Sequence, residues 1–200
     1  MQILKNKMKR TQKYILPIIG VVVLFGSCQK YTPKPHGFPK IEFPKKEYSK
    51  FDEGCSYTFD IPSYAIAERD THESALPCWF NIRIPQFGAT VYLSYRHLQS
   101  LEDLDTLREE AFKLANRNNI KADAIEDQVF ADSAHQTFGM TYDLLGPSAT
   151  PFNFYLTDVK KHYLRGSFYF DYKTNQDSVA PIYSFLKEDL QVLLKTLEWK

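Results

Sequence analysis

The 200-residue sequence is long enough for one compact domain, and its 44% hydrophobic, 15% aromatic and 24% charged residues are ordinary for a globular protein. The formal net charge of +1 is unevenly distributed, because residues 1–27 carry five Lys and Arg and no acid. Removing these five from the 25 basic residues leaves 20 against 24 acidic ones. This balance lacks the clustered positive charge that nucleic acid binding requires, so we expect no nucleic acid partner.

An export signal is predicted at residues 1–27. Its cations precede an apolar run, Ile15–Phe25, and the small residues Gly26 and Ser27 follow before Cys28. A run of about 11 residues is too short for a membrane-spanning helix, which needs about 20. The pattern therefore favours a cleaved signal peptide over a permanent membrane span.

The segment Leu24–Cys28 resembles a lipobox, so we predict that Cys28 becomes the lipid-bearing N-terminus. Two alternatives remain: an ordinary signal peptide followed by an accidental cysteine, and a start at Met8, which would leave the anchor prediction unchanged. Two or three acyl chains, at about 0.8 kcal/mol per buried methylene, would give stable membrane attachment. Residues 28–50 are rich in Pro and Lys and are predicted to form an extended tether.

Residues 51–200 are predicted to form one globular α+β domain. Alternating apolar residues predict strands at Tyr57–Ile61, Phe80–Ile84 and Ala89–Tyr95. A helix is predicted to begin after Ser100, because Asp103 is spaced for a capping box and Leu104, Leu107, Ala111 and Leu114 recur on one side. Glu109 and Lys113 are spaced for an ion pair on its other side.

Strand periodicity returns over Ala124–Phe130, Phe138–Leu144, Phe152–Leu156 and Leu164–Phe170. A final helix is predicted to begin near Ser178 with Pro181 in its first turn, followed by an apolar stripe of Ile182, Leu186, Leu190, Leu193 and Leu197. The expected fold is a mainly antiparallel sheet of about six to seven strands covered by two helices. By element order it is analogous to the Mog1/PsbP-like sandwich folds, an analogy without functional content.

Cys55 and Cys78 remain as a pair once Cys28 is acylated, in a compartment that permits oxidation. A disulfide between them would stabilise the fold by roughly 3 kcal/mol on the chain-entropy account. The alternative is two buried free thiols, because the sequence gives no distance between them.

The sequence offers no recognisable catalytic or metal-binding motif. No histidine has zinc-ligand spacing, and His72 with Glu73 and Cys78 is at most a weak cluster, so we expect no metal and no cofactor. The acids Asp123, Glu126 and Asp127 are interpreted as surface residues, because Asp123 and Asp127 would lie about 13 Å apart on one face of a strand. The loop Gly146–Pro151 is explained by turn chemistry alone, and Gly166 is interpreted as a close-packing position.

Several segments resemble one protein family over essentially the whole mature chain. They begin at Tyr31, Cys55, Cys78, Ile120, Phe154, His162 and Leu197, and read YTPKP, CSYTF, CWFNI, IKADAIE, FYLTD, HYLRG and LEW. They look like the gliding motility lipoprotein GldD of Bacteroidota. The resemblance implies a cell-envelope lipoprotein of the gliding machinery, linked to type IX secretion. For individual residues, the resemblance implies an acylated Cys28 and a Cys55 and Cys78 pair. It implies no catalytic residue.

Two functional hypotheses follow. The first is a non-enzymatic accessory subunit whose edge strand, loop or aromatic patch docks on another gliding or type IX secretion envelope protein. In this hypothesis the domain is lipid-anchored, and we expect it at the periplasmic face of the outer membrane. The alternative is a periplasmic ligand-binding or hydrolytic domain, which requires a concave pocket with converging polar groups.

Overall fold

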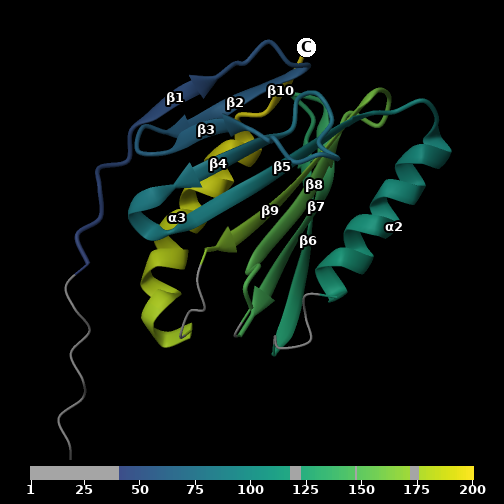
Figure 1. The fold of residues 1–200 in the computed structure, drawn as a ribbon. Helices are drawn as coiled ribbons and strands as arrows, with labels where there is room; N and C mark the ends of the chain where they lie inside the picture. Colours follow the sequence, from purple (N-terminus) through teal and green to yellow (C-terminus); the bar gives the residue numbers. More distant parts are fainter. Residues whose placement is uncertain (1–40, 118–122, 147, 172–175) are drawn as a thin grey trace, which may run out of the picture. The chain divides into compact units, whose positions relative to one another are not determined.

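The structure, a computed structural model, describes residues 41–117, 123–146, 148–171 and 176–200. The strands of its main sheet are β3 (Ile66–Arg69), β4 (Phe80–Ile84), β5 (Ala89–His97), β6 (Ala124–Asp132), β7 (Thr137–Leu145), β8 (Phe152–Thr157) and β9 (His162–Phe170). They pair antiparallel throughout in the order β3-β4-β5-β9-β8-β7-β6 (Figure 1). This confirms the predicted fold class, a mainly antiparallel α+β arrangement with seven strands.

A smaller sheet consists of β1 (Tyr48–Phe51), β2 (Tyr57–Pro62) and β10 (Glu198–Trp199), in the order β1-β2-β10. The long helices are α2 (Leu101–Arg117) and α3 (Gln176–Lys195), and a short 3-10 turn, η1 (Pro85–Phe87), precedes β5. Both sheets are antiparallel, and β2 lies between strands from near the start and the end of the described chain.

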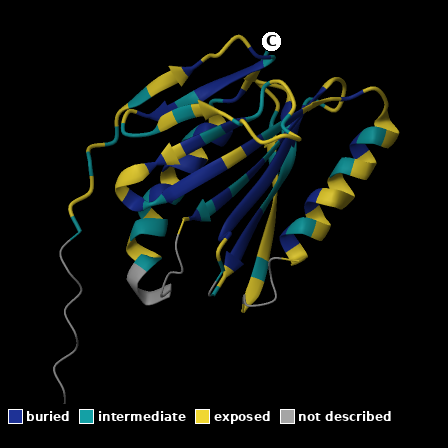
Figure 2. Ribbon diagram, viewed as in Figure 1, coloured by how far each residue is buried: buried dark blue, intermediate teal, exposed yellow. Residues whose placement is uncertain are grey.

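The two helices cover opposite faces of the main sheet. Helix α3 and the small sheet share one core with Phe154, Leu156 and Phe168, whereas α2 packs on Tyr155 and Tyr163. Neighbouring residues of a strand point to opposite faces, so the alternation within β8 and β9 separates these cores. Figure 2 shows the central strands of the main sheet as mostly buried and much of α2 as exposed.

Gly166 lies at the centre of the larger core and allows β8 and β9 to pack closely. A Cβ atom at this position would lie 2.1 Å from the Phe154 ring, so the absence of a side chain makes room for the aromatic ring. This confirms the interpretation of Gly166 as a close-packing position.

The capping box predicted for the first helix is present. Ser100 Oγ accepts from the Asp103 backbone N–H at 3.2 Å, and the Asp103 carboxylate accepts from the Ser100 backbone N–H at 3.0 Å. The predicted Glu109 and Lys113 pair also forms, with 3.0 Å between its charged atoms. The residues expected to end this helix, Asn118 and Asn119, lie outside the described residues.

Two expected boundaries differ from the structure. The tether was expected to reach residue 50, but residues 41–50 lie against the domain and include most of β1, because their aromatic and lysine side chains have partners on α3. Helix α3 begins at Gln176, ahead of the expected Ser178, so Pro181 lies within the helix and not in its first turn.

The predicted signal peptide, Cys28 and the first part of the tether lie outside the described residues. Within the part of the chain that is described, no helix is long and apolar enough to cross a membrane.

Candidate functional site

The chain enters the domain through a buried ionic contact on α3, which we call the Asp189 clamp (Lys46, Tyr48, Tyr64 and Asp189). Asp189 is only 5% exposed. Its carboxylate accepts from Lys46 Nζ at 2.7 Å and Tyr48 Oη at 2.8 Å, and also from Tyr64 Oη. Burial, and then the hydrogen bond to Asp189, raises the pKa of both tyrosines well above the ordinary value, so both hydroxyls remain donors. The carboxylate thus connects the start of the described chain to the core.

Aromatic contacts extend the clamp toward the N-terminus. The Phe43 ring stacks on Phe185 of α3 at 4.5 Å between ring centroids. Lys46 Nζ lies 3.7 Å from the centroid of the same Phe185 ring and donates to the Phe185 carbonyl at 2.5 Å. Phe43 and Lys46 therefore fix this part of the chain to α3 before it enters β1.

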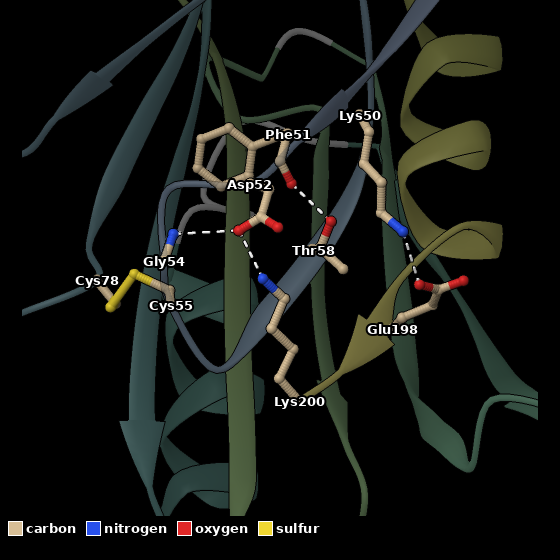
Figure 3. Close-up of polar contacts among 9 residues, drawn as sticks. All are labelled: Lys50, Phe51, Asp52, Gly54, Cys55, Thr58, Cys78, Glu198 and Lys200. Atoms are coloured by element: carbon tan, nitrogen blue, oxygen red, sulfur yellow. Dashed lines mark hydrogen bonds and ion pairs between the residues drawn. A yellow bond between two sulfur atoms is a disulfide. The ribbon is translucent and has the colours of Figure 1, made fainter.

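Ion pairs tie β1 and the following loop to the C-terminal residues, and the cysteine pair links the β1–β2 loop to the segment before β4 (Figure 3). Lys50 Nζ of β1 forms an ion pair with the Glu198 carboxylate of β10 at 2.8 Å. Lys200 Nζ forms a second ion pair with the Asp52 carboxylate at 2.5 Å. The hydrogen bond from Lys200, followed by that from the Gly54 backbone N–H, lowers the pKa of Asp52.

Cys55 and Cys78 are joined by a disulfide in the structure, with 5.8 Å between their Cα atoms. The adjacent Tyr57 Oη donates to the Cys78 carbonyl at 2.8 Å. The geometry of both residues therefore suits oxidation.

A chain of aromatic rings, three buried and the last half-buried, runs from the Cys55–Cys78 disulfide to β10. The Tyr57 ring lies 5.5 Å from Tyr95, and Tyr95 Oη hydrogen-bonds His162 Nδ1 at 2.8 Å. The His162 ring in turn stacks on Trp199, with 5.3 Å between centroids and 10° between planes. The Trp199 Nε1–H is buried and has no hydrogen-bond partner. The segments that resemble the GldD family at Cys55, Cys78, His162 and Leu197 thus meet at this end of the domain.

An open cleft of about 560 Å³ lies beside His162 and Trp199. Its wall comes from the turn between β6 and β7, the turn between β8 and β9, and the residues around β10. Lys160, Lys161 and Lys200 line it together with Asp158 and Glu198. Since Lys200 and Glu198 have ion-pair partners in the small sheet, Lys160 and Lys161 give the cleft its positive character.

Burial and backbone hydrogen bonds together set the protonation of His162 and Asp158. It lowers the pKa of His162, an effect that Asp158 opposes and that His97 and Lys161 reinforce. Burial would raise the pKa of Asp158, but backbone N–H donors from His162, Lys160 and Lys161 outweigh it and lower that pKa. His162 is therefore neutral and Asp158 ionised near pH 7.

A second buried carboxylate, Asp143 of β7, faces α3. Tyr183 Oη donates to it at 2.6 Å, and Lys187 Nζ forms an ion pair with it. These residues adjoin a hollow of about 240 Å³ between β6, β7 and α3. The hydroxyl and the ammonium satisfy Asp143 internally, as a buried carboxylate requires.

The acids singled out in the sequence do not converge. Asp123 precedes β6, whereas Glu126 and Asp127 are exposed neighbours in it and point to opposite faces. His72 is exposed and contacts Ser74 at 3.0 Å. No group of three or more His, Cys, Asp and Glu suited to a metal ion occurs among the described residues.

Sequence reasoning missed the Asp189 clamp and the His162 stack. Asp189 follows Leu186 by three residues and therefore lies on the apolar side of α3, and a charge within an apolar stripe was the available signal. His162 had no comparable signal, because Tyr95 and Trp199 are 67 and 37 residues away in the sequence.

Comparison with known proteins gives one family and a distant structural likeness. The family described as gliding motility lipoprotein GldD matches residues 28–199. One similar solved structure is the solution structure of cyanobacterial PsbP (CyanoP) from Synechocystis sp. PCC 6803, with 13% sequence identity and a TM-score of 0.47. The match covers 84% of the present chain and 100% of the PsbP chain. No curated protein sequence matches the chain.

We predict that Asp189→Asn destabilises the domain by about 2–4 kcal/mol, because it leaves the Lys46 ammonium, only 22% exposed, without its buried counter-charge. Urea unfolding measures the loss, and amide hydrogen exchange should accelerate in residues 46–51. Glu188→Gln is the matched control, since Glu188 lies 3.5 Å from Lys46 but is 70% exposed. Its effect should stay within about 0.5 kcal/mol. Equal losses in the two variants would contradict the clamp.

We also predict a histidine-dependent acid sensitivity. The pKa of His162 is lower in the folded than in the unfolded chain, so stability is lost as the pH falls from about 6.5 through the lowered folded pKa. The stability difference between wild type and His162→Gln should therefore shrink between pH 7.5 and 5.5 in urea unfolding. His135→Gln should behave oppositely, because Asp132 raises the pKa of His135 and wild type gains stability on acidification. Parallel profiles for the two variants would show that burial does not set the protonation of His162.

Proposed function

The chain belongs to the gliding motility lipoprotein GldD family, and from this membership we propose that it is a non-enzymatic, lipid-anchored accessory component of the gliding and type IX secretion machinery. The observation that carries the proposal is the extent of the match. It spans residues 28–199 and begins at Cys28, the residue proposed to bear the lipid after removal of residues 1–27.

We propose that the domain acts by docking on other envelope proteins close to the membrane. Residues 28–40 separate the lipid site from the described chain, and 13 residues extend at most about 45 Å. The Asp189 clamp then fixes the following segment to α3. Confinement of this kind raises the effective concentration beside other membrane-bound proteins, so weak contacts suffice for docking.

The proposed location is the periplasmic face of the outer membrane. The lipoprotein family supports attachment to the envelope. Membrane fractionation with inner- and outer-membrane markers decides between the two membranes.

One observation favours the alternative of a ligand-binding domain. The cleft beside His162 is large enough for a small molecule, and Lys160 and Lys161 would favour an anionic one. A soluble ligand reaches the cleft whether or not the domain is anchored. Loss of the lipid therefore separates this alternative from docking on membrane-bound partners.

We predict that Cys28→Ser removes membrane attachment and impairs gliding and secretion, because the domain loses its local concentration beside its partners. Membrane fractionation, colony spreading and secreted-protein profiles measure the effect, with immunoblotting to match abundance. Mass spectrometry of the wild-type protein should find an acylated Cys28 as its first residue. Normal gliding by the released variant at normal abundance would favour the ligand-binding alternative.

We propose that Cys55 and Cys78 are oxidised in the exported protein. Alkylation of the denatured, unreduced protein should label neither cysteine, and reduction should expose both. We expect Cys55→Ser with Cys78→Ser to lower stability by roughly 3 kcal/mol, as for a closed loop of this length. Two labels incorporated without reductant would show that the thiols are free.

A further inference from the structure

Strand β6 is a long open edge of the main sheet. Among the described residues it pairs only with β7, and its nine residues compare with four in β3, the opposite edge. Every second residue of an edge strand directs its N–H and C=O away from the sheet, so β6 offers about four unpaired backbone positions. Figure 2 shows β6 exposed over most of its length beside buried strands. An extended segment is able to add there as a further strand.

An apolar hollow adjoins this edge. Val129 of β6 is 78% exposed, and its partner in β7, Met140, packs against the core beneath α2. Both line a hollow of about 280 Å³ together with Phe138, Val159 and Leu104, which we call the β6 hollow. Arg108 also lines it, but its guanidinium is paired with Tyr155 and Asp105. The alternate side chains of an added strand would point toward this hollow, so it gives apolar side chains a place to be buried.

The charge of the edge restricts its occupant. Residues 123–132 contain four acids, Asp123, Glu126, Asp127 and Asp132, and no Lys or Arg. Asp132 is paired with His135 at 2.7 Å, so the attraction rests on the other three. A strand that carries Lys or Arg would complement these acids. A second copy of the same edge would instead place acid beside acid, which is the arrangement by which natural edge strands avoid self-association.

We propose that β6 is the docking strand for a positively charged, extended segment of a partner protein, which lengthens the main sheet and places apolar side chains in the β6 hollow. The inference deepens the proposed accessory function and rests on it for the biological setting. Recognition combines backbone hydrogen bonds along β6, burial at Val129 and attraction by the acids of residues 123–132.

A peptide of defined chemistry tests the surface directly. The probe is a fluorescein-labelled nonapeptide of alternating Lys and Val, and its matched partner carries Glu in place of Lys. With the full-length lipoprotein in detergent, fluorescence anisotropy should show binding of the Lys peptide and at least about tenfold weaker binding of the Glu peptide, since like charges repel. Equal binding of the two peptides, or no binding of the Lys peptide, would overturn the proposal.

Two matched substitutions locate the site. Val129→Lys adds a cation to an exposed position, so the fold should tolerate it, and it should weaken binding of the Lys peptide at least about tenfold. Ile66→Lys is the control, because Ile66 is the 49% exposed apolar residue of the opposite edge strand, and it should change binding less than about twofold. Equal effects would place binding elsewhere.

The in-cell test separates this inference from the proposed function. Val129→Lys should impair gliding while membrane attachment and abundance stay normal, whereas Ile66→Lys should not; normal gliding of Val129→Lys would refute the docking role. If cells that carry Cys28→Ser glide normally, the proposed anchored function is wrong. The peptide-binding measurement still tests docking on β6 in that case. Disulfide-linked homodimers of Val129→Cys would assign the edge to a second copy and refute a basic partner.

Discussion

A buried carboxylate at Asp189 joins residues 46–48, at the start of the described chain, to the body of the domain. Its donors come from Lys46 and Tyr48 on one side and from Tyr64 on the other, so the bonds tie the incoming segment and the small sheet to the same turn of α3. A buried charge is stable only when its partners are in place. Correct seating of the incoming segment is therefore a condition for a stable core.

The main sheet has a buried centre and an exposed edge, because its strands are covered unequally. In its centre, β8 is buried on both sides, between α3 with the small sheet and α2. At its edge, β6 is exposed along most of its length, and Val129 lies outside both cores. The centre supplies rigidity, and the edge leaves backbone and apolar groups free for association.

Periodicity revealed the long elements because each buries a regular face. Alternation located β2, β4, β5 and β6 to β9, and the Ser100 and Asp103 capping box located the start of α2. The short strands β1, β3 and β10 have four, four and two residues, too few for a period, and their partners specify them. The Pro and Lys composition around Lys46 looked like a linker because its partner, Asp189, is 143 residues away. The sequence also could not indicate the His162 stack, which depends on how three strands meet.

The position of β10 beside β2 has a consequence for the order of folding. Strand β2 lies early in the domain, yet one of its two neighbours, Glu198–Trp199, comes 140 residues later and brings Trp199 onto His162. Contacts between such distant segments form slowly. A chain that still lacks residues 198–199 lacks this neighbour, so the small sheet closes only once nearly the whole polypeptide is available. The topology thereby delays completion of the small sheet, and the stacking of Trp199 on His162, until the C-terminal residues are present.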